Sequence, residues 1–286
     1  QTIGSGPYPA GMEILATTDF PNALYYCGQD IAYANCARSD DGGITFGPAI
    51  PMYELTTCAG LHGHLRVAPD DTVYVPVPNC NGETGLAVSE DAGITWNVST
   101  IPGSESSGFD PQFAIAADGT GYMCFAKGLG QAYVSVTTDK GATWSEPYNV
   151  SSALGLKHTA FPQAVAGDGD RAACGFLGTT TQGNANSLTF EGVWHVYFAT
   201  TFDRGETWEV VNATPNDPVQ GYGGIWDGGG GNYNRNLLDF NEITIDDRGF
   251  PIYGYSDGCI GSCDADPVNN TFAAYPKMVR QVGGKS

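Results

Sequence analysis

The sequence predicts an all-β protein, a β-propeller built from four-stranded antiparallel sheets, or blades. Three observations support this prediction. A motif of the form Ser/Thr-x-Asp-x-Gly-x-Thr-aromatic occurs four times, a second Asp-containing turn also occurs four times, and the two alternate in a nearly regular register. Units of ~40–50 residues with four strands each are typical of propellers. A β-sandwich is the alternative, but a sandwich would not repeat two different turns in a fixed register.

The first motif occupies residues 39–46, 89–96, 137–144 and 201–208. Its Asp can accept hydrogen bonds from the backbone N–H groups that follow, and its Gly can adopt a positive φ. The Thr and the aromatic residue restart a strand, and the aromatic ring can pack between neighbouring sheets. We therefore predict that these aspartates form hairpin turns and are not catalytic. They are Asp41, Asp91, Asp139 and Asp203.

The second turn contains Asp70, Asp118, Asp168 or Asp246 and precedes the first motif by 19 residues in two units, from 70 to 89 and from 118 to 137. Apolar runs on both sides of each turn predict strands. The expected strands are 62–68, 72–77, 84–89 and 95–101; 110–117, 121–126, 131–137 and 143–148; 159–166, 171–177, 193–200 and 207–212; and 239–245, 250–256 and 271–282, after a less regular first unit near 12–53.

Antiparallel strands alternate in direction, so both kinds of turn should lie on one face of the propeller, which we call the turn face. The long insertions 178–192 and 215–235 should then lie on the opposite, variable face. Variable loops on a rigid scaffold commonly carry binding sites. We expect one propeller domain over residues 1–286, with about five blades visible. Strand-like residues in 1–11 and a start at Gln1 suggest that part of the first blades is missing.

Composition limits the function. With 12 Lys and Arg against 31 Asp and Glu, the net charge is −19, which argues against nucleic acid or an anionic membrane as a partner. The sequence contains no apolar run long enough for membrane insertion. No cofactor is certain, no metal site is identified, and calcium is a candidate because of the acidic composition.

The eight cysteines predict disulfides in an exported protein, located outside the cell or on its surface. Cys124 and Cys174 occupy equivalent second strands of adjacent blades, so they could form a bridge between blades. The other expected pairs are Cys27 with Cys36 across a hairpin, Cys58 with Cys80 between two loops of the variable face, and Cys259 with Cys263 in a local loop. Eight cysteines allow many other connectivities.

Polar residues gather where the inner strands begin, at the variable face. They are His62, His64, Asp110, Gln112, Lys157, His158, Asp239 and Asn241. Such a cluster could bind a sugar, a metal or a phosphate, and the alternative is a hydrated polar channel. Trp226, with Tyr222 and Tyr233, supplies aromatic rings on the same face. Aromatic platforms beside carboxylates and amides are usual in carbohydrate sites.

The four motifs resemble the Asp boxes, or BNR repeats, of the sialidase (neuraminidase) superfamily, particularly of secreted bacterial or archaeal sialidase-like proteins. The resemblance implies a six-bladed, exported propeller. It also implies three arginines that grip the substrate carboxylate, a Tyr nucleophile paired with a Glu, and an Asp acid/base. Of the seven arginines, Arg38, Arg171, Arg204 and Arg248 lie beside or in turns and are expected to be solvent-exposed. Arg66, Arg235 and Arg280 remain for the triad.

The same resemblance implies Tyr255 with Glu242 as the nucleophile pair and Asp30 as the acid. The alternative is that Tyr255 packs in the core and Glu242 lines the channel. The Phe-Arg-Ile-Pro stretch that sialidases usually carry is absent from the sequence. Two functions follow as hypotheses. One is a sialidase-type hydrolase acting on a carbohydrate or glycoprotein. The other is a non-catalytic extracellular propeller for adhesion, glycan binding or self-assembly into a surface layer or filament.

Overall fold

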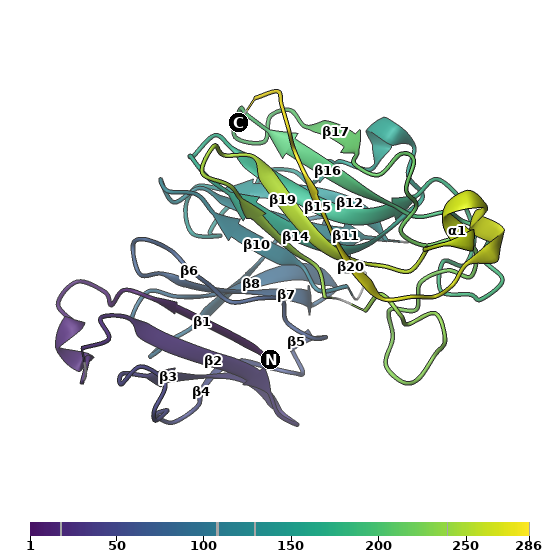
Figure 1. The fold of residues 1–286 in the computed structure, drawn as a ribbon. Coiled ribbons are helices and arrows are strands. Elements are labelled where there is room, and N and C mark those ends of the chain that lie inside the picture. Colours follow the sequence, from purple (N-terminus) through teal and green to yellow (C-terminus); the bar gives the residue numbers. More distant parts are fainter. Residues whose placement is uncertain (18, 107–108, 129, 239, 286) are drawn as a thin grey trace.

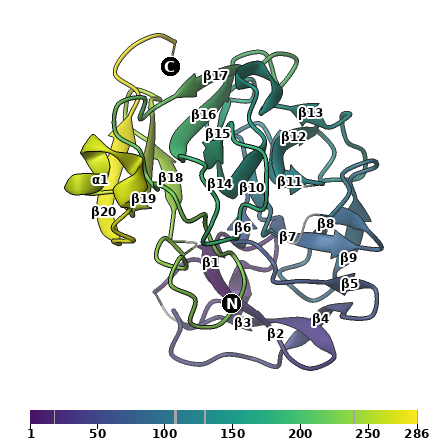
Figure 2. The same ribbon diagram turned by 90° about the vertical axis from the view of Figure 1, so that its right-hand side faces the viewer.

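The computed structural model describes residues 1–17, 19–106, 109–128, 130–238 and 240–285. The strands of this described part form five antiparallel sheets, which confirms the all-β propeller. Figure 2 shows these sheets following one another around a common centre. The first two sheets contain β1 (Thr2–Gly6), β2 (Ala23–Gln29), β3 (Tyr33–Ser39) and β4 (Ile50–Glu54), then β5 (Cys58–Ala59), β6 (Arg66–Val67), β7 (Val73–Cys80), β8 (Glu83–Ser89) and β9 (Asn97–Thr100).

The third and fourth sheets each have four strands, and the fifth has three. Their strands are β10 (Gln112–Ile115), β11 (Gly121–Lys127), β12 (Gln131–Thr137) and β13 (Tyr148–Asn149); β14 (His158–Ala166), β15 (Ala172–Thr179), β16 (His195–Thr201) and β17 (Glu209–Asn212); and β18 (Glu242–Ile245), β19 (Pro251–Asp257) and β20 (Tyr275–Arg280). The short helices are η1 (Glu13–Leu15), η2 (Ser152–Leu154), α1 (Ser262–Ala265) and η3 (Pro267–Asn269). The innermost strands β1, β6, β10, β14 and β18 lie nearest the centre around which the sheets are arranged (Figure 2), and Figure 1 shows the same ribbon in a view turned by 90°.

The strand-like residues in 1–11 suggested a further, incomplete blade. Residues 2–6 do not form one. They form β1, which pairs with β2 as the first strand of the first sheet. Gly4 and Gly6 allow β1 to pack closely on the second sheet, because a Cβ atom at either position would lie 2.3 Å from a side-chain atom of Leu65 or Val67. The absence of a side chain at these two positions therefore sets the spacing between the first two sheets.

Two expected strands are much shorter than predicted, and one short strand, β5, was not predicted. The expected strand 62–68 is reduced to Arg66–Val67. Pro76 and Pro78 on β7 stand opposite residues 64 and 62 in this register, and proline has no N–H to donate. The expected strand 143–148 is reduced to Tyr148–Asn149 because the Oγ of Ser145 accepts the N–H of Val136, which a ladder partner would otherwise accept.

All four copies of the first motif form the same turn. In the second copy, the Asp91 carboxylate accepts hydrogen bonds from Ser89 Oγ at 2.9 Å, the Thr95 N–H at 2.8 Å and Thr95 Oγ1 at 2.6 Å. The motif Gly adopts a positive φ, as expected, and so does the residue before it, for example Ala92 at 57° and Gly93 at 78°. The N–H of Gly93 reaches back to Ser89 Oγ at 2.9 Å. The turn is therefore closed by side chains within seven residues.

The aromatic residue of the motif packs between sheets in the fourth copy. Trp208 meets Tyr122 of the preceding sheet edge-to-face, with ring centroids 6.4 Å apart. The four expected disulfides are all present, and the Cys124–Cys174 bridge joins the third and fourth sheets. Cys27, Cys36, Cys58 and Cys80 are buried in a cluster of the first two sheets, and Cys124, Cys174, Tyr122 and Trp208 in a cluster of the third and fourth.

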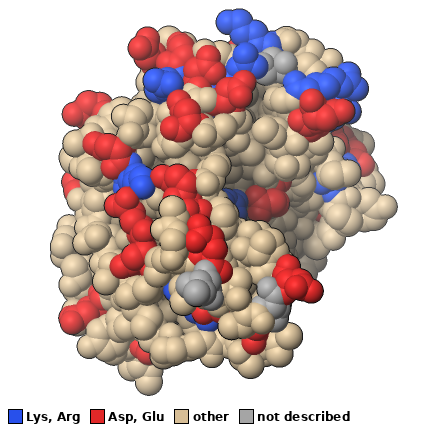
Figure 3. All heavy atoms as spheres, turned by 90° about the vertical axis from the view of Figure 1, so that its left-hand side faces the viewer, with Lys and Arg blue, Asp and Glu red and all other residues tan. Residues whose placement is uncertain are grey.

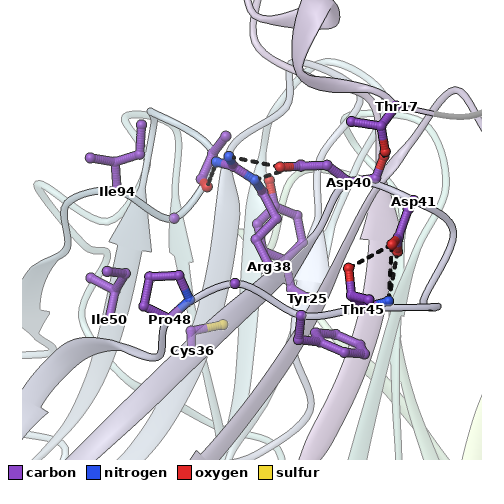
Figure 4. A pocket seen from close by; sticks show the side chains of 14 residues that line it. Thr17, Tyr25, Cys36, Arg38, Asp40, Asp41, Thr45, Pro48, Ile50 and Ile94 are labelled. Atoms are coloured by element: carbon purple, nitrogen blue, oxygen red, sulfur yellow. Dashed lines mark hydrogen bonds and ion pairs between the residues drawn. The ribbon is translucent and has the colours of Figure 1, made fainter.

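Acidic side chains gather on the turn face, which is hollowed near its centre (Figure 3). A cavity of about 430 Å³ lies between the first two sheets beside the turns (Figure 4). Arg38 spans it: its Nε donates to Asp40 at 2.8 Å and its Nη1 to the Ala92 carbonyl at 2.7 Å. The prediction of an exposed Arg38 is wrong, because its side chain is only 19% exposed. Through these two contacts Arg38 joins the first two blades across the cavity.

Candidate functional site

A second cavity, of about 380 Å³, opens at the variable face over the inner strands, and we call it the mouth cavity. The face that carries it is seen in Figure 2. Two long loops border the inner strands there, one between β15 and β16 and one between β17 and β18. The cavity is lined by Leu61, His64, Phe109, Asp110, Gln112, Phe161, Pro162, Gln163, Trp226, Asp227, Gly228, Gly229, Arg235 and Leu238.

Two glutamines on adjacent inner strands line the mouth cavity with unsatisfied amides. Gln112 begins β10 and Gln163 lies on β14, and each is 3% exposed. The Oε1 atom of each is buried and has no hydrogen-bond partner among the described residues. An unpaired buried acceptor costs about 1–3 kcal/mol. Because each oxygen is buried, it can accept a hydrogen bond from a polar ligand only when its side chain turns toward the cavity, which both glutamines line.

The wall of the mouth cavity also contains strained backbone. Phe161 and Leu238 both have φ near 53°, a left-handed conformation that side chains disfavour. Phe161 lies in a register shift between Ala160 and Gln163 on β14, and Pro162 in the same stretch has no N–H for the ladder. Bulges beside functional sites commonly re-aim side chains. Here Phe161 and Gln163, on either side of Pro162 in the shifted stretch, both line the cavity.

Beside the mouth cavity, His64, Arg66 and Glu242 connect the second and fifth sheets. Glu242 Oε2 lies 3.7 Å from His64 Nδ1, and Glu242 Oε1 lies 3.5 Å from Arg66 Nη2. Burial alone would raise the pKa of Glu242. The nearby imidazole of His64, the positive charge of Arg66 and the hydrogen bond from the N–H of Ile243 outweigh burial and lower this pKa. Glu242 is therefore held as a carboxylate and is not suited to donate a proton.

The Gly-rich part of the β17–β18 loop is folded against itself. Trp226 Nε1 donates to the Gly229 carbonyl at 3.0 Å, and Arg235 Nε donates to the Gly228 carbonyl at 2.8 Å. Asp227 Oδ1 accepts from Asn186 Nδ2 at 2.7 Å, which ties this loop to the β15–β16 loop. These contacts fix the side of the cavity that carries the indole ring.

Several of the residues predicted for the variable-face cluster come together here. His64, Asp110, Gln112, Trp226 and Arg235 line the mouth cavity. His158 lines an adjoining cavity, where its ring meets Phe190 edge-to-face.

Four other members of the predicted cluster do not line the mouth cavity or are not described. Lys157 is exposed and lines neither of these two cavities. His62 is buried, and burial lowers its pKa below the ordinary 6.5. Asn241 is also buried, and Asp239 lies outside the described residues.

The residues expected from the sialidase resemblance are not brought together. Arg235 lines the mouth cavity, and Arg66 pairs with Glu242 beside it. Arg280 pairs with Asp246, in the β18–β19 turn on the turn face. The three arginines therefore do not share a pocket.

Tyr255 and Glu242 lie on the paired strands β19 and β18, whereas Asp30 lies in a turn of the first sheet. Tyr255 is 4% exposed and stacks on Tyr253 with ring centroids 6.3 Å apart. Burial raises the pKa of Tyr255 to about 12, so its hydroxyl is a poor nucleophile. Asp30 sits in the β2–β3 turn and accepts the N–H groups of Ala32 and Tyr33, which lower its pKa. A carboxylate with a lowered pKa is not suited to act as an acid near neutral pH.

Sequence reasoning missed nine of the residues that line the cavity, which are Leu61, Phe109, Phe161, Pro162, Gln163, Asp227, Gly228, Gly229 and Leu238. One signal was available, because a proline within an expected strand indicates a bulge or an edge. Pro162 could therefore have drawn attention to Phe161 and Gln163. Leu238 and Phe109 come from irregular segments, for which the strand register gives no position.

Within the part of the chain that the structure describes, no group of three or more His, Cys, Asp or Glu side chains is arranged to hold a metal ion. No helix in this part is both long and apolar enough to cross a membrane. The four disulfides are consistent with an extracellular protein.

No protein-family model matches the sequence, and no curated protein matches it. Solved structures do resemble it. A polysaccharide lyase of family PL25, an ulvan lyase, is 14% identical with a TM-score of 0.57, over 99% of this chain and 71% of that chain. Hydrazine synthase of Kuenenia stuttgartiensis is 14% identical with a TM-score of 0.53, over 82% of this chain and 61% of that chain.

The intramolecular trans-sialidase of Ruminococcus gnavus is 15% identical with a TM-score of 0.46, over 87% of this chain and 49% of that chain. The chain thus spans less than two thirds of the hydrazine synthase and trans-sialidase chains. The trans-sialidase likeness is too weak to support an argument. At 14% identity, the likeness to the lyase and the synthase shows the fold and no activity.

Proposed function

We propose that this protein is an extracellular glycan-binding propeller and that the mouth cavity is its sugar site. The observation that carries the proposal is the pairing of buried amides with aromatic rings. Gln112 and Gln163 line the cavity together with Phe161 and Trp226, and the carbonyl oxygen of each glutamine lies unpaired and buried behind this lining. Sugars present hydroxyl donors around apolar ring faces, and this combination of groups complements both.

The charged groups of the cavity fit the same ligand class. Asp110 and Asp227 are acceptors for hydroxyl groups, and Arg235 supplies donors. The cavity volume of about 380 Å³ falls in the range of ~300–1,000 Å³ that is usual for small-ligand pockets. The similar ulvan lyase, which was solved with a bound sugar chain, adds support at the level of the fold.

Sialoside hydrolysis is the less supported alternative. It needs several arginines around one carboxylate and an activated tyrosine. The separation of Arg66, Arg235 and Arg280 and the burial of Tyr255 argue against this arrangement. The binding proposal requires neither feature.

The test is a binding screen of the full chain by calorimetry. The probes are soluble β-glucan, mannan and xylan oligosaccharides, uronic-acid oligosaccharides and 3′-sialyllactose. We expect at least one probe to bind, and expect Trp226→Ala and Gln112→Met each to weaken that binding by about tenfold or more, equivalent to ~1.4 kcal/mol. The matched control is Tyr148→Ala, which removes an exposed aromatic ring from β13, away from the cavity.

Binding that survives both cavity substitutions would place the sugar site elsewhere and contradict the proposal. Each bound probe is also incubated with the protein and its products are separated by chromatography. Release of sialic acid that depends on Arg66 would favour the hydrolase instead.

A further inference from the structure

The mouth cavity has a neighbour on the variable face, which we call the side cavity. It has a volume of about 290 Å³ and is lined by residues that include His158, Thr159, Asn184, Asn186 and Trp194. Phe109 and Asp227 line both cavities, so the two adjoin. The β15–β16 loop supplies much of the outer wall of the side cavity.

Strand β14 runs beneath both cavities. Thr159 and Ala160 line the side cavity, and Phe161, Pro162 and Gln163 line the mouth cavity. The bulge at Phe161 therefore falls at the boundary between them. A ligand that follows β14 across this boundary would contact both.

The polar lining continues from one cavity to the other. Asn184 and Asn186 bring side-chain amides to the side cavity, as Gln112 and Gln163 do to the mouth cavity. The bond between Asn186 Nδ2 and Asp227 Oδ1 ties the two bordering loops together at the shared wall. Two adjoining pockets with the same kinds of donors and acceptors are suited to successive units of a chain.

The charges of this double site do not favour an anionic chain. Asp110 and Asp227 are carboxylates, whereas Arg235 is the only Lys or Arg among the described residues that line the two cavities. Arg235 also donates its Nε to the Gly228 carbonyl. The net charge of −19 adds long-range repulsion toward any polyanion.

We infer that the two cavities together bind an uncharged oligosaccharide chain, with successive sugar units lying along β14 on both sides of the shared Phe109 and Asp227. This inference rests on the proposed function, since it presupposes that the mouth cavity binds sugar. It adds that the ligand is a chain, not a single terminal sugar, and that the chain carries no repeated negative charge.

The experiment measures affinity against chain length for whichever neutral series binds, from the disaccharide to the hexasaccharide. Uronic-acid oligosaccharides of equal length are measured in parallel. We expect affinity to rise at least about tenfold along the neutral series. We also expect neutral chains to bind more tightly than acidic ones, with little change as ionic strength rises.

Asn184→Trp places a bulky ring in the exposed loop at the side cavity. It should abolish the rise in affinity with chain length and leave the affinity for the disaccharide unchanged. Asn184→Ala is the milder second variant and should reduce the gain. Thermal unfolding of both variants shows whether they are folded.

The outcomes separate the two proposals. Affinity that is independent of chain length but still weakened by Trp226→Ala would overturn the inference and leave the proposed function standing. Tighter binding of acidic chains than of neutral ones would overturn the claim of an uncharged ligand. Failure of every probe to bind would overturn the proposed function, and this inference with it.

Discussion

On the turn face, the carboxylate of Asp91 accepts three or more hydrogen bonds from groups within four residues of it. In the mouth cavity, the carbonyl oxygens of Gln112 and Gln163 are buried without a partner among the described residues. Both regions contain left-handed backbone, at Ala92 in the turn and at Phe161 in the cavity. In the turn, local hydrogen bonds offset this strain, and in the cavity wall the neighbouring amides stay unsatisfied. The contrast separates a turn whose carboxylate is satisfied by local groups from a cavity lining that leaves two acceptors unsatisfied.

The largest expected effect concerns the scaffold alone. Replacing both Cys124 and Cys174 by Ser removes a bridge between residues 50 apart in sequence, which should lower the free energy of unfolding by about 4 kcal/mol. The matched control replaces Cys259 and Cys263, which are four residues apart, and should cost only about 2 kcal/mol. Denaturant unfolding under oxidising conditions measures both. Equal losses would show that loop closure does not account for the stabilisation.

The next effect tests the turn face at a single residue. Asp91→Ala removes the acceptor for Ser89 and Thr95, so we expect a loss of about 1–3 kcal/mol in the free energy of unfolding. Glu90→Ala is the matched control, because Glu90 is an exposed neighbour whose ion pair with Lys140 should contribute less than about 1 kcal/mol. Glycan affinity should not change in either variant. A loss of affinity in Asp91→Ala without a loss of stability would contradict the separation of the two faces.

How far the sequence could predict each region follows from this difference. The turn depends on Ser89, Asp91, Gly93 and Thr95, which lie within one short motif, so its geometry could be inferred from residue chemistry alone. The four disulfides could be inferred from equivalent or nearby positions. In these cases the interacting groups are close in sequence, or they occupy equivalent positions in two copies of the repeat.

The candidate site was predictable only in part. His64 and Asp110 were predicted because the spacing of the repeated turns indicates where each inner strand begins at the variable face. Gln163 was missed, because its place on the wall depends on the bulge at Phe161. Arg280 was assigned to a substrate site. Its guanidinium instead pairs with Asp246, which lies in the β18–β19 turn. Such details arise from contacts between segments distant in sequence.

A smaller effect of opposite sign is expected in the mouth cavity. Gln163→Met keeps the length of the side chain and removes the unpaired carbonyl oxygen, so the free energy of unfolding should rise by about 1 kcal/mol. The same change should weaken glycan binding, since the acceptor is lost. Thermal unfolding and calorimetry on one preparation measure both quantities. A variant that is less stable than the parent would show that Gln163 is already satisfied within the fold.

The smallest effect at any one residue is the response of the turn face to acid. Hydrogen bonds from the Thr45 hydroxyl and N–H lower the pKa of Asp41 from 3.8 to about 2. Because the folded-state pKa is the lower one, the stabilisation is complete above pH 3.8 and is lost as the pH falls through about 2. The midpoint of thermal unfolding should therefore decline across this window. Asp41→Asn should flatten that part of the decline, because an amide does not titrate. An unchanged pH profile in Asp41→Asn would show that the loss of stability in acid arises from other carboxylates.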